Sequence, residues 1–208
     1  MYMKYILISA VLILISLFLI NFSKIEKFRN ENKRTFDFVL SLISTFTGFF
    51  IALSLNTILG DMQQKQNLVK LLGASNLAIE NCRMRTQGTY INNMKKGANL
   101  SELIKTTEVE LPRIYPNLED NDLVNTYFSA NGYQAYILCI DGMENFVKNL
   151  NSATIPDNIK TKVINDYMNY MTLAEKINTL EVDRINGKIS QNDENAQLKT
   201  IATQLTFK

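Results

Sequence analysis

Two long stretches without a charged side chain lie near the N-terminus, at residues 5–22 and 38–59. Because an α-helix rises about 1.5 Å per residue, 18 residues extend ~27 Å, close to the ~30 Å hydrocarbon core of a bilayer. A cleaved signal peptide is the alternative for the first stretch. Against it, the stretch is long for such a segment, and no small-x-small cleavage motif follows Ile20. We therefore predict transmembrane helices over about residues 5–22 and 37–59.

Beyond residue 60, apolar positions recur at spacings of three, four and seven, the pattern of amphipathic helices. No proline interrupts residues 36–87, so the second membrane helix is expected to continue into the polar part of the chain as one long helix. A loop containing Gly88 and Gly97 follows, and two prolines make residues 108–118 an irregular connector. Further helices are predicted over residues 101–106, 123–128, 133–150, 154–187 and from 190 onward.

Three helix starts depend on particular residues. Thr154 is a favourable N-cap with Pro156 in the first turn, and Ser190 caps the last helix. The pair Asn131-Gly132 is expected to interrupt the helical pattern before residue 133. The predicted fold class is all-α: two transmembrane helices in residues 1–60, followed by an α-helical bundle or hairpin array in residues 61–208.

Basic residues are concentrated between the two predicted spans. Residues 1–60 carry six basic and three acidic side chains, and five of the six basic ones lie in the loop 23–35. Only Lys65 and Lys70 follow the second span closely. Short loops rich in Lys and Arg stay in the cytoplasm. We therefore expect the soluble domain outside the cytoplasm; the mirror topology, with a cytosolic domain, is the alternative.

The second span carries small and polar residues every fourth position, which places them along one stripe of a helix. The stripe consists of Ser44, Gly48, Ala52 and Asn56. Small residues let two backbones approach closely in lipid, and Ser or Asn can hydrogen-bond across the contact. Three hypotheses follow: the stripe packs on the first span of the same chain, it joins copies of the chain into a homo-oligomer, or it lines a narrow pore.

The second predicted span resembles a helix found in a known group of proteins. The string Gly48-Phe-Phe-Ile-Ala-Leu-Ser-Leu-Asn56 leads into Gln-rich and then Leu-rich sequence. It is similar to a group of uncharacterised bacterial membrane proteins, in which a Gly-x-x-Ile-Ala-Leu-x-x-Asn membrane helix continues into a soluble helix. The resemblance covers residues 38–82. Here an extra span precedes it, and Thr57 stands where an aromatic residue often follows the Asn. It implies a bacterial inner-membrane protein without an assigned activity.

Composition removes several function classes. The chain has no histidine, the commonest general base and metal ligand, so Ser–His or Cys–His nucleophile pairs and His-containing zinc sites are excluded. Residues 61–208 hold sixteen basic and seventeen acidic side chains and lack the positive surface that nucleic-acid binding requires. We expect no catalytic residue, cofactor, metal site or nucleic-acid partner.

The two cysteines allow two interpretations. Cys82 and Cys139 both lie in apolar helical sequence, where a free thiol behaves as a small buried hydrophobe. An extracytoplasmic domain would alternatively permit a disulfide between them.

The function expected from the sequence is that of a membrane-anchored helical interaction or scaffold protein without catalytic activity, whose partners are the bilayer, an unidentified protein and copies of itself. The alternative is a two-span effector of the stress or phage-defence type that oligomerises and permeabilises the membrane.

Overall fold

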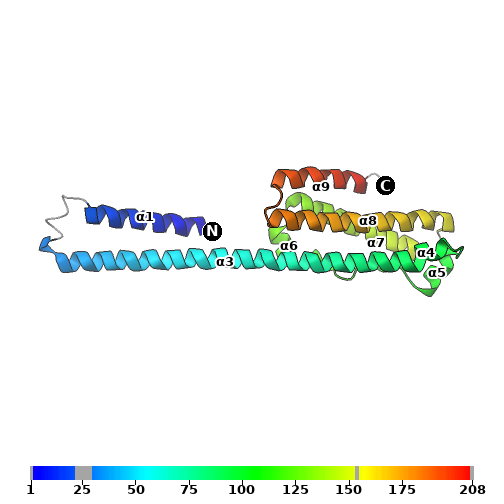
Figure 1. Ribbon diagram of the computed structural model, residues 1–208, viewed down its shortest axis with the longest axis horizontal. Coiled ribbons are helices and arrows are strands. Elements are labelled where there is room, and N and C mark those ends of the chain that lie inside the picture. Colours follow the sequence, from blue (N-terminus) through cyan, green and yellow to red (C-terminus); the bar gives the residue numbers. More distant parts are fainter. Residues whose placement is uncertain (1, 22–29, 153–154, 207–208) are drawn as a thin grey trace. The chain divides into compact units, whose positions relative to one another are not determined.

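The computed structural model describes residues 2–21, 30–152 and 155–206. Those residues form helices and no strand, so the prediction of an all-α chain is confirmed. Contacts divide the chain into two units, Met1–Gln64 and Lys65–Lys208. The order of the elements is shown in Figure 1. Most of the basic loop 23–35 lies outside the described residues.

The first unit contains α1 (Tyr2–Asn21) and the first part of α3 (Lys33–Thr86). The two helices pack side by side, with the Tyr5 ring stacked on Phe50 at 6.2 Å between centroids. Ser9 on α1 and Ser54 on α3 are buried. Both helices are long and apolar enough to cross a membrane, and only 6% of the apolar window of each is buried.

The helix α3 is continuous over 54 residues, which confirms the prediction that the second apolar segment runs on into the polar part of the chain. It ends in a π-helical turn, η2 (Gln87–Ile91), followed by the short α4 (Asn92–Met94). The predicted loop around Gly88 is therefore wrong. Gly97 follows with a φ of +92°, a backbone conformation that glycine adopts without strain.

The second unit is a helical bundle. Its long helices are α7 (Ala130–Asn151), α8 (Asp157–Ile185) and α9 (Gln191–Thr206), which pack with the second part of α3 (Figure 1). The core combines aliphatic residues of α3 with aromatic residues of α7 and α8. Its most deeply buried side chains include Leu68, Leu72, Ile79, Tyr115, Tyr136, Met143, Ile164, Tyr167 and Met171.

Two short helices begin at asparagine caps: α5 (Leu100–Thr106) at Asn99 and α6 (Asp122–Tyr127) at Asn121. The connector between them is irregular, as predicted, apart from the turn η3 (Pro116–Leu118). Tyr136 Oη donates a hydrogen bond from α7 to the carbonyl of Tyr115, and Tyr167 Oη donates one from α8 to Glu110 O at 2.6 Å. These buried hydroxyls hold the connector against the bundle.

Two predicted helix starts differ from the structure. Ser129 caps α7 by accepting from Gly132 N at 2.9 Å, so Asn131 and Gly132 lie in the first turn instead of interrupting the helix. Pro156 is the N-cap residue of α8, one position before the helix, while Thr154 lies outside the described residues. The cap at Ser190 is confirmed, since its Oγ accepts from Asp193 N at 3.2 Å.

Candidate functional site

The four predicted helix-packing residues are all exposed on α3: Ser44, Gly48, Ala52 and Asn56. A Cβ atom built at Gly48 would meet no atom within 4 Å. The helix α1 packs instead against a different side of α3, where Phe50 stacks on Tyr5 and Ser54 is buried. The hypothesis that the stripe packs on the first span is therefore wrong, and the stripe is an open face of the first unit.

Two polar groups of the stripe lack the intrahelical hydrogen bond that most Ser and Thr hydroxyls of these two apolar segments make. Ser9 Oγ donates to the carbonyl of Tyr5 at 2.9 Å, and Thr47 Oγ1 donates to that of Ile43 at 2.8 Å. Within the described part of the chain, the Ser44 hydroxyl and the Asn56 amide have no such partner. Unpaired polar groups are costly in an apolar surrounding, so within a membrane both groups would gain from a hydrogen-bond partner outside the chain.

The structure does not bring the two cysteines together. Both are buried and free, and each has its own hydrogen-bond partners. Cys82 Sγ donates to Glu110 O at 3.4 Å, and Cys139 Sγ donates to Tyr170 O at 3.3 Å. Burial raises the pKa of Cys139 to about 12, so its thiol stays protonated and unreactive at neutral pH.

A buried charged cluster joins α7, α8 and α9. Glu181 and Glu194 are both 0% exposed, and Arg184 lies between them. Arg184 Nε donates to Glu181 Oε2 and to Glu194 Oε1, each at 3.1 Å, and Nη2 donates to Glu181 Oε2 at 2.6 Å. Glu181 Oε1 also accepts from Ser129 N at 3.0 Å and from Ser129 Oγ at 2.7 Å. We call Ser129, Glu181, Arg184 and Glu194 the acidic cluster.

The two carboxyl groups of the acidic cluster are not equivalent. Glu181 accepts from Ser129 and Arg184 with four short contacts, whereas Glu194 shares Arg184 Nε and accepts from Gln191 Nε2 at 3.3 Å. Burial and the neighbouring Glu181 raise the pKa of Glu194 to about 7, although Arg184 acts in the opposite direction. The Glu194 carboxyl therefore keeps its proton to a higher pH than an ordinary glutamate does.

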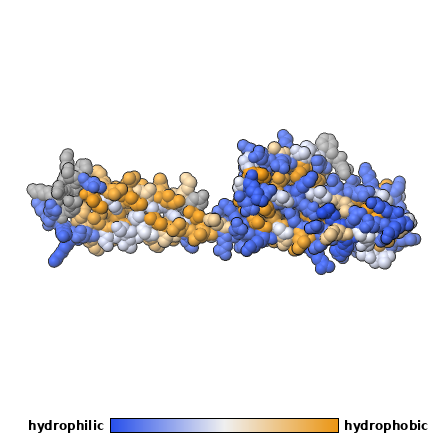
Figure 2. All heavy atoms as spheres, viewed as in Figure 1, coloured by the Kyte–Doolittle hydropathy of each residue, from blue (hydrophilic) through white to orange (hydrophobic). Residues whose placement is uncertain are grey.

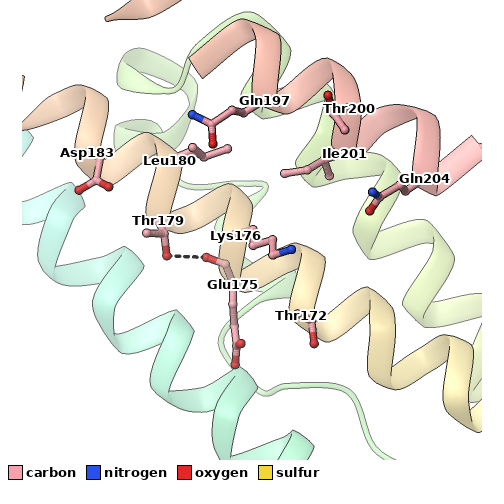
Figure 3. A pocket seen from close by; sticks show the side chains of 10 residues that line it. All are labelled: Thr172, Glu175, Lys176, Thr179, Leu180, Asp183, Gln197, Thr200, Ile201 and Gln204. Carbon is pink, nitrogen blue, oxygen red and sulfur yellow. Dashed lines mark hydrogen bonds between the residues drawn. The ribbon is translucent and has the colours of Figure 1, made fainter. Parts of the chain in front are cut away.

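An open groove of about 660 Å³ runs between α8 and α9. Leu180 and Ile201 give it an apolar part, and polar side chains of both helices surround them (Figure 3). Thr179 Oγ1 donates to the Glu175 carbonyl at 2.7 Å, so this hydroxyl bonds to its own helix. The Glu175 carboxylate pairs with Arg83 on α3 at 3.5 Å. The groove has apolar and hydrogen-bonding surface, and its two carboxylates pair with Arg83 and Lys188.

The comparisons with protein-family models, with curated proteins and with solved structures find no match for this chain.

Proposed function

We propose that the chain is a membrane-anchored helical interaction protein without a catalytic role. In this proposal α1 and the first part of α3 cross the bilayer, the residues from Lys65 onward form a soluble helical domain, and the stripe on α3 joins copies of the chain. The observation that carries the proposal is the open stripe. Among the described residues, Gly48 at its centre has no atom near its Cβ position, and the polar groups of Ser44 and Asn56 are unpaired.

The exposed surface of the first unit supports the membrane position. Large apolar side chains point outward on both helices, among them Leu7, Leu14, Phe38 and Leu59, each more than 60% exposed. Figure 2 shows apolar residues over most of the visible face of this unit, whereas the visible face of the second unit is mostly polar. Soluble proteins rarely expose apolar patches beyond a few hundred Å², and the core helix of a soluble protein would be mostly buried.

The stripe has the composition of a helix-packing face in lipid. Apolar surface provides little drive for association inside a bilayer, so close backbone packing and interhelical hydrogen bonds decide which faces meet. Gly48 and Ala52 permit close approach, while Ser44 and Asn56 supply hydrogen-bonding groups at either end. Because α1 covers another side of α3, a second copy of α3 is free to occupy the stripe.

The test of self-association is Gly48→Leu in the full chain, measured as oligomer mass in lipid nanodiscs or mild detergent. A leucine at the centre of the contact should weaken association on the order of tenfold or more, since a side chain forced into a packed contact costs about 1–3 kcal/mol. Phe46→Leu, at an exposed position off the stripe, should leave the mass unchanged.

Ser9→Leu is the matched small-to-large control, because Ser9 is buried in the contact between α1 and α3. It should lower thermal stability without changing the oligomer mass. An unchanged mass for Gly48→Leu, or an equal change for Phe46→Leu, would show that the stripe faces lipid and would reject the proposal.

A permeabilising effector is the second candidate, favoured by the polar groups on the same stripe. An oligomer that places Ser44 and Asn56 around a central axis would give ions a polar path. This function requires that the reconstituted chain leak ions from vesicles and that Gly48→Leu stop the leak. Self-association without leakage leaves the interaction protein as the function.

The proposed orientation places the soluble domain outside the cytoplasm, because five basic residues lie in the loop 23–35. Protease added to spheroplasts should then degrade residues 65–208. Full protection of these residues in intact spheroplasts, with digestion after lysis, would establish the mirror topology instead.

A further inference from the structure

The helix α9 is held to the bundle at both of its ends. Near its C-terminal end, Tyr170 Oη of α8 donates to Leu205 O at 2.7 Å. Along its length Leu198 and Ile201 are buried in the core. At its first turn, Glu194 enters the acidic cluster and bonds to Arg184. Glu194 thus ties the first turn of α9 to the end of α8, and beside it Asn131 Nδ2 of α7 donates to Asn195 Oδ1 at 2.8 Å.

The acidic cluster contains more carboxyl groups than cationic groups, so its stability depends on whether a carboxyl group is protonated. It holds two carboxyl groups and one guanidinium, and both glutamates are fully shielded from water. With both carboxyl groups ionised, one negative charge would be buried without compensation, which is strongly unfavourable. Glu194 accepts fewer hydrogen bonds than Glu181, so we assign the shared proton to Glu194, while Glu181 is bonded to Ser129 and Arg184.

We propose that the acidic cluster is a proton-sensitive latch for α9: a proton on Glu194 favours the docked position of α9 on α7 and α8, and loss of that proton raises the population in which α9 is detached. Release uncovers the apolar sides of α7 and α8 that now face Leu198, Ile201 and Leu205.

The remaining charged groups around the latch are paired elsewhere. Asp193 of α9 accepts from Ser190 Oγ at 2.7 Å, and Lys188 in the α8–α9 turn pairs with Asp183 at 2.9 Å. On the α6 side, the Tyr127 carbonyl accepts from Arg184 Nη2, and Lys65 of α3 lies 5.7 Å from the centre of the Tyr127 ring. Arg184 is the cation that bonds to both buried carboxyl groups.

The direction of the pH effect follows from proton binding. A Glu carboxyl has an ordinary pKa of 4.5, and docking raises that of Glu194 to about 7, so the docked state binds more protons between these values. Docking is therefore strongest at the acidic end of this window and weakens as the pH rises toward 7. A single proton with these two pKa values changes the docking equilibrium roughly tenfold between pH 6 and pH 8.

Hydrogen exchange of the full chain in nanodiscs, read by mass spectrometry and corrected for intrinsic rates, tests the latch. The opening constant of amides in α9 should rise roughly tenfold from pH 6 to pH 8, while amides in the middle of α8 should not change. Glu194→Gln mimics the protonated carboxyl, so it should keep α9 protected at pH 8 and remove the pH dependence.

Asp193→Asn is the matched control, because this neighbouring carboxyl is exposed and outside the cluster; the tenfold change should persist in it. The proposal is overturned if α9 opens equally at pH 6 and pH 8 in the unsubstituted chain, or if Glu194→Gln retains the pH dependence. If Glu194→Gln does not fold, the comparison of α9 exchange at pH 6 and pH 8 in the unsubstituted chain is sufficient to test the proposal.

Discussion

Replacing Arg184 by methionine should lower the free energy of unfolding by about 3–5 kcal/mol, because it leaves two carboxyl groups buried without a cation. The substitution also removes the hydrogen bonds to Glu181, Glu194 and the Tyr127 carbonyl. Denaturant unfolding of the full chain in detergent, followed by circular dichroism, measures the loss. The loss should be smaller near pH 5, where protonation of a carboxyl relieves part of the buried charge.

Lys188→Met provides the control for this substitution. Lys188 also forms an ion pair, but its side chain is 65% exposed, and exposed pairs contribute about 0–1 kcal/mol. A loss below about 1 kcal/mol for Arg184→Met, similar to that of Lys188→Met, would mean that water reaches the acidic cluster. The α9 latch, which requires that Glu181 and Glu194 are shielded from water, would then be rejected.

Gly142→Ala should destabilise the bundle by about 1–3 kcal/mol, although alanine favours helix over glycine. A Cβ atom at this position of α7 would overlap the ring of Tyr170 on α8. The ring is fixed by the hydrogen bond from its hydroxyl to Leu205 and by an edge-on contact with Phe146 at 4.8 Å. Thermal unfolding should show the loss directly.

The same substitution at Gly73 should have the opposite sign. Gly73 lies inside α3 on an exposed side, and an added Cβ would meet no atom within 4 Å. Gly73→Ala should therefore stabilise the protein by about 0.5–1 kcal/mol through helix propensity alone. Stabilisation by both substitutions would show that α7 and α8 pack less closely at Gly142 than the structure describes.

The long helix and the aliphatic core could be predicted from the sequence, because both are local. Leu68, Leu72 and Ile79 recur at helical spacing on α3, and all three are fully buried. No proline interrupts residues 36–87, and α3 is continuous over most of this range. A periodic pattern of this length specifies its own secondary structure and its own buried side.

The acidic cluster could not be found in this way, because only Glu181 and Arg184 are close in sequence and the other members come from other elements. Ser129, Glu181 and Glu194 lie on three elements, and glutamates in a polar helix have the pattern of solvated residues. Gly132 is the one local signal, and it favoured a break in the helix. Its actual role is spatial: a Cβ there would overlap Glu181 Oε1, so the missing side chain makes room for the buried carboxylate.

The stripe on α3 could be predicted from the sequence only in part. Four-residue spacing identifies Ser44, Gly48, Ala52 and Asn56 as one face of a helix, but spacing does not determine which face a neighbouring helix covers. That choice depends on packing, and the structure puts α1 on the side of Phe50 and Ser54. The uncovered stripe is why self-association is proposed.

Cysteine cross-linking in native membranes tests self-association through the stripe most directly. Gly48→Cys places a thiol at the centre of the stripe, whereas Phe46→Cys places one at an exposed position off it. Under a membrane-permeant oxidant, the Gly48→Cys chain should form a disulfide-linked dimer. Phe46→Cys and the unsubstituted chain, whose two cysteines are buried, should remain monomeric on non-reducing gels. Equal cross-linking at both positions, or none at Gly48, would contradict the proposed interface.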